Sequence, residues 1–286
     1  MNRPGCVLVL LLVPFLAQAD KERTVWKGPD QPVYVVTQNN YGEDFGGTTP
    51  RFGDLIAIEI FNPKARADDD ESAYRPGERL ALFAKGHKMG EVTVKRIANF
   101  QCDSSAALVS PDQGFHLQKD AKVLASNARS IRTHESGQRH PDAQERKYAV
   151  ELAMNEFRKH GVSAGMASDV KIDRLIVTKI DESNSQFLIG SLSLRTKSAL
   201  HEAFLIGKIG VSNATAELVQ YNKSIDLTEA TDGEDYIFID QLDLDGDGVD
   251  ETVVELRGYE DEEFDIYKRY GGSWREVHDG GVGGCD

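Results

Sequence analysis

The sequence is poor in cysteine, has no hydrophobic run long enough to cross a membrane after its first twenty residues, and carries no known catalytic motif. It contains no G-x-S-x-G, no H-E-x-x-H, no P-loop and no glycine fingerprint of dinucleotide binding. The histidines show no pair at metal-ligand spacing; they stand at positions 87, 116, 134, 140, 160, 201 and 278. The chain therefore gives no sign of a local catalytic centre, although a triad assembled from distant residues stays open.

The first residues have the pattern of a signal peptide. Arg3 precedes an apolar stretch from Cys6 to Leu16, and Ala17-Gln18-Ala19 supplies a small-x-small cleavage pattern. Cys6 lies inside this stretch rather than just after it, which argues against a lipoprotein anchor. We expect residues 1–19 to be removed and the protein to be exported to a periplasmic or extracellular compartment.

Two cysteines, Cys102 and Cys285, remain after this removal. In an oxidising compartment they are most simply interpreted as one disulfide, which would pack the two halves of the chain together. Two free thiols are the alternative, because the sequence gives no distance between them.

Negative charge is concentrated at the end of the chain. Residues 231–286 contain 18 acidic and 4 basic residues, so they carry nearly all of the net charge of −14. This distribution disfavours nucleic acid and anionic lipid as partners and favours cations or a basic surface. A solvated acidic face is the alternative for acidic residues outside the motif described below.

The first half, residues 20–127, is predicted to be a small β barrel or sandwich. Short apolar and β-branched runs separated by turns indicate its strands: Val33 to Thr37, Leu55 to Phe61, Arg79 to Ala84, Glu91 to Ile97 and Ala106 to Val109. Residues 128–141 are polar and basic without a hydrophobic period, which predicts a linker.

One amphipathic helix is predicted at the start of the second half, residues 142–286. Asp142 and Glu145 form a capping-box pattern, and Gly161 suits the position after the helix end. Val150, Ala153, Met154 and Phe157 share one face, and Glu145, Lys147, Glu151 and Arg158 are expected to face solvent. Alternating strands follow to the C-terminus and predict an acidic β-meander or a partial propeller-like sheet.

The run from Asp243 to Glu251, DLDGDGVDE, places carboxylates at alternate positions around Gly248. Calcium takes six to eight oxygen ligands, and alternate residues of a tight loop can direct oxygens inward. An EF-hand is excluded because Val254 stands where its twelfth, bidentate residue would be. The predicted ligands are side chains of Asp243, Asp245, Asp247 and Glu251 and the Val249 carbonyl. An acidic turn without metal is the alternative.

This run and its flanking strand patterns resemble the calcium loops of FG-GAP and VCBS-type repeats, which occur in integrin-like propellers and many exported bacterial proteins. The resemblance implies ligands at loop positions one, three, five, seven and nine, which are the five residues named above. Glu251 departs from the aspartate usual at the ninth position.

An earlier segment, from Lys179 to Gly190, has the same order of strand, polar turn and strand. Its turn carries Asp181, Ser183 and Ser185, so hydroxyls replace carboxylates. We interpret it as a metal-free copy of the acidic turn, with two unrelated hairpins as the alternative.

Together these patterns lead to an expected exported, calcium-stabilised, non-enzymatic protein with a binding or scaffold role and an unidentified protein partner. An exported hydrolase with a structural calcium ion and a calcium-bridged adhesion module are the alternatives.

Overall fold

A computed structural model describes residues 26–39, 52–64, 74–100, 104–112, 115–119, 121–225, 235–257 and 262–282. The protein is mainly β, with 55% of the described residues in strands and 11% helical, which confirms the predicted fold class. The predicted signal peptide, Cys102 and Cys285 lie outside the described residues. No helix in the described part of the chain has the length and apolar character needed to cross a membrane.

The first half forms a closed barrel, which decides between the predicted barrel and sandwich. Its order is β1-β2-β5-β4-β3-β6. The strands are β1 (Val33–Gln38), β2 (Leu55–Phe61), β3 (Arg79–Ala84), β4 (His87–Phe100), β5 (Ser104–Pro111) and β6 (Val123–Ser126). The sixth strand was not predicted, and β4 is longer than its predicted core.

The second half forms two four-stranded antiparallel sheets rather than one meander. Each sheet is itself a meander, because its strands neighbour one another in chain order. The first sheet contains β7 (Lys171–Thr178), β8 (Phe187–Arg195), β9 (Leu200–Ile209) and β10 (Ala214–Ser224). The second contains β11 (Asp235–Leu242), β12 (Glu251–Arg257), β13 (Glu262–Tyr270) and β14 (Ser273–Val282).

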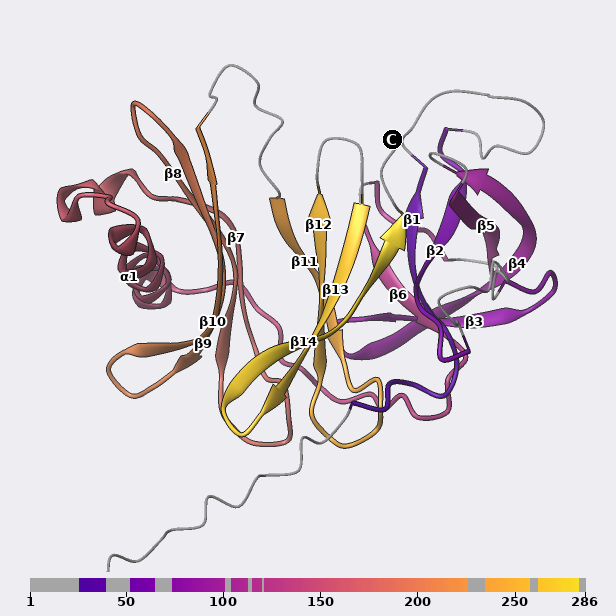
Figure 1. Cartoon of the computed structure of the whole chain (residues 1–286). Helices are drawn as coiled ribbons and strands as arrows, with labels where there is room; N and C mark the ends of the chain where they lie inside the picture. Colours follow the sequence, from indigo (N-terminus) through magenta and orange to yellow (C-terminus); the bar gives the residue numbers. More distant parts are fainter. Residues whose placement is uncertain are drawn as a thin grey trace, which may run out of the picture.

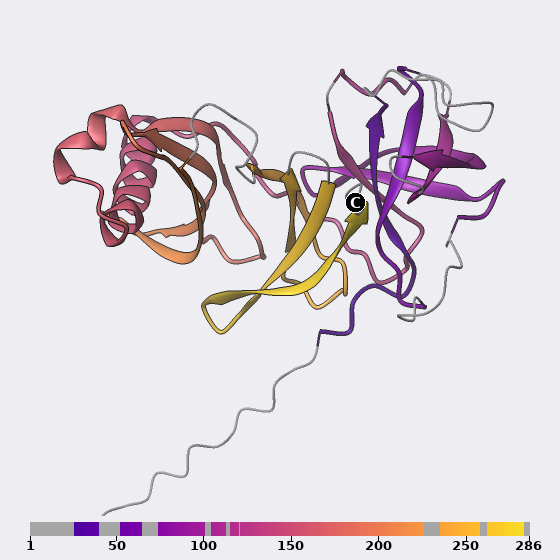
Figure 2. The ribbon, with the colours of Figure 1, turned by 45° about the horizontal axis from the view of Figure 1, so that its top comes forward.

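These units are stacked as layers, with helix α1 (Ala143–Lys159), the first sheet, the second sheet and the barrel in that order (Figures 1 and 2). Apolar clusters fill each junction. One cluster contains Phe157 of α1 and Leu205 of the first sheet, a second contains Phe204 and Val254 from the two sheets, and a third contains Phe264 of the second sheet and residues of the barrel. Burial of apolar surface at all three junctions joins the units into one body.

Strand β1 is buried on both faces, which explains its continuous apolar sequence. Tyr34 and Val36 belong to a cluster with residues from every strand of the barrel, whereas Val33 and Val35 belong to the cluster that includes the second sheet. Successive strand side chains point to opposite faces, so one strand serves both cores.

The helix begins and ends where the sequence predicts. Asp142 is the N-cap, its carboxylate accepts from the Glu145 amide, and the Glu145 carboxylate accepts from the Asp142 amide. Gly161 follows the C-cap residue with φ of 89°. The prediction that Glu145 faces solvent is wrong, because it is 7% exposed and paired with Arg139.

The segment predicted as a linker forms backbone contacts with both sheets. Arg139 exchanges two backbone hydrogen bonds with Val177 of β7, each 2.9 Å long. The Arg132 amide donates to the Asp243 carbonyl at 3.0 Å. This segment therefore follows the edge of the first sheet and the start of the acidic turn.

Candidate metal centre

The acidic turn joins β11 to β12 and lies between two other segments of the chain. On one side the Ser130 hydroxyl donates to the Leu244 carbonyl at 2.8 Å. On the other side the Asp250 amide donates to the Ile180 carbonyl at 2.7 Å, and Asp181 and Val249 form an isolated β-bridge. The turn thus contacts both the linker segment and the turn that joins β7 to β8.

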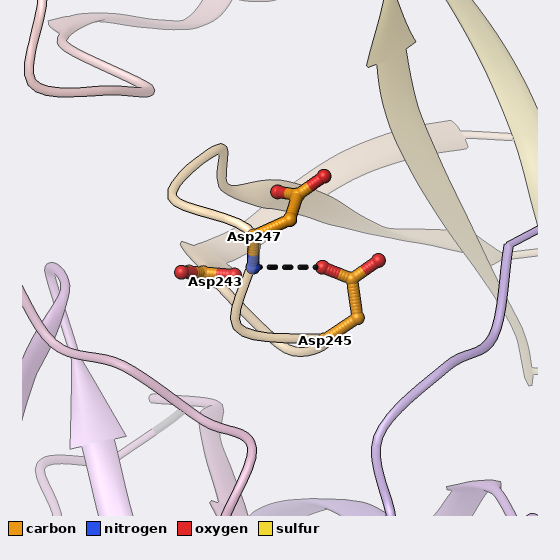
Figure 3. A group of neighbouring side chains, drawn as sticks. All are labelled: Asp243, Asp245 and Asp247. Atoms are coloured by element: carbon orange, nitrogen blue, oxygen red, sulfur yellow. Dashed lines mark hydrogen bonds between the residues drawn. The ribbon is translucent and has the colours of Figure 1, made fainter.

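Three of the predicted ligands lie together in this turn. Asp243, Asp245 and Asp247 each offer a carboxylate oxygen, and these oxygens lie within 4.8 Å of one another. Figure 3 shows the three side chains on one turn, with the Asp247 amide bonded to the Asp245 carboxylate at 3.3 Å. Carboxylate oxygens are the ligands that hard cations take, so this cluster could hold a metal ion.

Backbone amides hold the carboxylates in place. Asp243, which is 2% exposed, accepts hydrogen bonds from the amides of Gly246 at 2.7 Å and Gly248 at 2.9 Å. Asp247 accepts from the Val249 amide at 3.0 Å. Side chains that bond to backbone a few residues onward are typical of tight polar turns, so the sequence itself sets this geometry.

Gly246 is required by conformation and by space. Its φ is +81°, and a Cβ there would lie 2.6 Å from the Ser130 carbonyl oxygen. Residues other than glycine rarely adopt this φ, so a side chain here would push the turn away from the linker segment.

Glu251 does not join the three aspartates. Its carboxylate is completely buried, and it accepts hydrogen bonds from the Leu244 amide at 2.7 Å and from the Trp26 indole at 3.2 Å. It is also paired with the ammonium of Lys268. Glu251 therefore fixes the base of the turn, next to Asp250 in the chain.

Lys268 of β13 is the central cation of the site. Its ammonium lies 2.9 Å from Asp245 Oδ2 and 3.1 Å from Asp247 Oδ2, in addition to its pairing with Glu251. Only 2% of this residue is exposed. Lys268 thus connects the carboxylates of Asp245 and Asp247 with that of Glu251.

Burial is the largest single influence on the pKa values of Glu251, Asp243 and Lys268. It raises the pKa of Glu251 to about 7, against the opposing effect of Lys268. Burial also raises the pKa of Asp243, with a further contribution from Asp247 and Asp245. Burial alone would lower the pKa of Lys268, but the attraction of Glu251 and Asp245 raises it above its usual value.

A third buried carboxylate of the turn, after those of Asp243 and Glu251, is Asp250. It accepts a hydrogen bond from Gln241 Nε2 at 2.9 Å, and its Oδ1 lies 3.2 Å from His134 Nδ1. Burial raises the pKa of Asp250, and the interaction with Asp250 raises the pKa of His134. This pair adds a third contact between the turn and the linker segment, after those of Ser130 and Arg132.

Four neighbours of the site were not predicted from the sequence: Lys268, Trp26, Asp250 and His134. One signal for Lys268 was present, since Phe264, Ile266 and Lys268 alternate on one face of β13 and the first two are buried. A lysine that continues an apolar face indicates a buried acidic partner. Trp26 comes from a distant part of the chain and has no comparable signal.

No protein-family model, curated protein or solved structure matches this chain. The resemblance to FG-GAP and VCBS-type loops therefore stays a prediction.

Proposed function

We propose that this is an exported protein in which the turn from Asp243 to Glu251 binds calcium, and that the ion stabilises a binding or scaffold surface. The observation that carries the proposal is the cluster of Asp243, Asp245 and Asp247 oxygens within 4.8 Å.

The charge of the site supports a cation. Four carboxylates, those of the three aspartates and Glu251, gather around a single ammonium, so the formal charge is −3 when all are ionised. Like charges at this separation repel, and a divalent ion would remove most of the excess.

Calcium fits this donor set better than magnesium. The three aspartates stand on one short turn, and calcium accepts irregular sets of carboxylate, carbonyl and water oxygens. Magnesium demands near-octahedral geometry and retains its waters. Extracellular calcium sites can be weak, with dissociation constants of about 10⁻⁴ to 10⁻³ M, and still be filled.

The position of the turn explains how an ion would act. The turn touches the linker segment through Ser130 and the β7–β8 turn through Ile180. A bound ion would fix the turn and with it both contacts, so the two sheets would keep their relative placement. This role is static and needs no catalytic residue.

The decisive experiment compares Asp245→Ala with Glu151→Ala, a variant of an exposed helix residue. Thermal unfolding of the native protein and of Glu151→Ala is expected to move to higher temperature with millimolar calcium, because the ion binds only the folded state. Asp245→Ala is expected to lose this shift. An equal calcium shift in Asp245→Ala would refute the assignment.

An exported hydrolase is a second candidate, favoured by a polar cavity of about 600 Å³ between the two sheets. Glu202 and Asp235 line it, and burial together with the Asp235 carboxyl raises the pKa of Glu202 to about 7. A carboxyl that keeps its proton near neutral pH beside a second carboxyl is the arrangement of an acid–base pair.

A screen of ester, glycoside, peptide and phosphate substrates tests this candidate. Turnover by the native protein and by Glu151→Gln, but not by Glu202→Gln, would favour the hydrolase. Absence of turnover across the screen would favour the binding or scaffold role.

A further inference from the structure

A groove lies where the barrel meets the edges of both sheets, away from the acidic turn. Its volume is about 660 Å³, within the range of small-molecule sites. The tip of the β3–β4 hairpin, the segment before β6, the linker segment, β7 and β11 all contribute to it.

The groove has an apolar floor. Ile189 is fully buried, and Leu175 and Phe238 are 8% and 9% exposed. Met89 lies at the same groove and is 46% exposed, which makes it one of the few large apolar side chains on the described surface. A flexible thioether beside an apolar floor suits contact with aliphatic ligands of varied shape.

Two exposed cations at the groove, Lys85 and Arg174, form no salt bridge with a described residue, although Lys85 is close enough to the buried Asp240 to favour its ionised form. Two other charged residues at the groove already form salt bridges. Lys122 pairs with Glu255 at 2.9 Å, and Asp173 pairs with Lys171 at 2.5 Å. Asp240 is 4% exposed and accepts from the Lys85 amide. The free charge that the groove offers to a ligand is therefore positive.

Lys85 also has an unusual backbone. Its φ is +55°, the only positive φ of a non-glycine residue in the described ranges, and it forms a two-residue turn with Gly86. Both φ values are positive, as in a type I′ turn, where asparagine or glycine is preferred at this position. A lysine held in a disfavoured conformation suggests a role for its side chain.

We propose that this groove binds an aliphatic carboxylate, with the chain on the floor formed by Leu175, Ile189 and Phe238 and the head group between Lys85 and Arg174. The apolar tail of such a ligand would cover the apolar floor, and its single anionic head group would pair with the two cations. The site is separate from the proposed calcium turn.

Calorimetric titration with sodium dodecanoate below its micelle concentration tests this site in the purified protein. No divalent cation is added, because calcium precipitates the dodecanoate salt, and circular dichroism checks that the protein is folded. One dodecanoate is expected to bind per chain, whereas dodecyltrimethylammonium, with the same tail and opposite charge, is not.

Lys85→Asn and Arg174→Gln are each expected to weaken dodecanoate binding about tenfold, the effect of losing one charged hydrogen bond. Asparagine suits the turn, so Lys85→Asn keeps the fold. Lys88→Gln, in the same hairpin but outside the groove, is the matched control and should bind normally. Equal affinity in the double variant Lys85→Asn, Arg174→Gln, or equal binding of both amphiphiles, would overturn the proposal. So would absence of dodecanoate binding, or preference for an extended peptide that pairs with β7.

Discussion

Two turns of this protein occupy the same place in the two sheets, and only one of them carries a cluster of three carboxylates. Each joins the first and second strands of a four-stranded meander, β7 to β8 and β11 to β12. When Asp181 is aligned with Asp243, Ser183 falls opposite Asp245. Each of these two accepts a hydrogen bond from the second amide that follows it, at 3.2 Å and 3.3 Å. The same local bond is therefore made by a hydroxyl in one turn and a carboxylate in the other.

The comparison distinguishes what sets the shape of the turn from what requires its negative charge. The β7–β8 turn is held by Asp181 and serine hydroxyls, so a hairpin at this place does not need a group of carboxylates. The charge at Asp243, Asp245, Asp247 and Glu251 calls for another explanation, and the proposed ion supplies one. Substitutions in either turn or in its immediate surroundings test this distinction.

The largest effect is expected from Lys268→Met. Removal of the ammonium leaves Glu251 and Asp245 without their cation, and breaking a buried ion pair costs about 3 kcal/mol. Without calcium, the free energy of unfolding in urea should fall by this amount. With calcium, the variant should recover much of the loss and bind the ion more tightly, because the ammonium no longer competes. A loss that calcium leaves unchanged would show that Lys268 stabilises the turn independently of any ion.

A smaller effect is expected from Asp243→Ala compared with Asp181→Ala. Asp243 accepts two backbone hydrogen bonds while buried, whereas Asp181 accepts one from the Ser183 amide. We expect losses of about 2 kcal/mol and about 1 kcal/mol in the free energy of unfolding. Only Asp243→Ala should also lose the calcium response. Identical calcium shifts in both variants would contradict the distinction between the turns.

Asp240 and Thr178 extend the comparison, since the same alignment places them opposite each other in β11 and β7 and both are buried. Burial raises the pKa of Asp240 from 3.8 to about 7. The folded state therefore keeps a proton that the unfolded state has released, so stability from this group is complete below pH 3.8 and is lost as pH rises through 7.

Asp240→Asn removes this titration and keeps an oxygen for the Lys85 amide. At pH 8 the variant should be more stable than the native protein by about 1 to 2 kcal/mol, and below pH 4 the difference should disappear. Urea unfolding at pH values from 4 to 8 measures it. Parallel stability curves for the two proteins would rule out a raised pKa.

The smallest effect is expected from adding carboxylates to the β7–β8 turn through Ser183→Asp and Ser185→Asp together. Three carboxylates would then stand at alternate positions, and their repulsion should lower the free energy of unfolding by about 0.5 kcal/mol without calcium. Calcium should restore it, and the stoichiometry measured by calorimetry should rise from one ion to two. A stoichiometry that stays at one would mean that the surroundings of the acidic turn matter as much as its carboxylates.

Local patterns predicted much of this structure. The limits of α1 followed from Asp142, Glu145 and Gly161, and most strands followed from runs of apolar residues. Asp243, Asp245 and Asp247 came together because their spacing and the neighbouring glycines determine the turn. These features depend on residues close in sequence.

What the local patterns missed are contacts between distant residues. Glu251 was predicted as a ligand together with the three aspartates, and its pairing with Trp26 and with Lys268, on the neighbouring strand β13, at the base of the turn was not foreseen. Glu145 was assigned to solvent because its partner Arg139 lies before the helix. The choice between barrel and sandwich depended on the pairing of β1 with β6, which no local pattern specifies.

The helix and the barrel lie at opposite ends of the stacked sheets, and this fixes how many sheets the stack can hold. Repeat arrays grow because the last unit still presents a face that another copy can cover. Here α1, through Phe157 and its buried neighbours, covers one terminal face and the barrel covers the other, so a third sheet has no free face to pack against. The stack therefore holds two sheets, and removal of α1 would expose an apolar surface through which molecules self-associate.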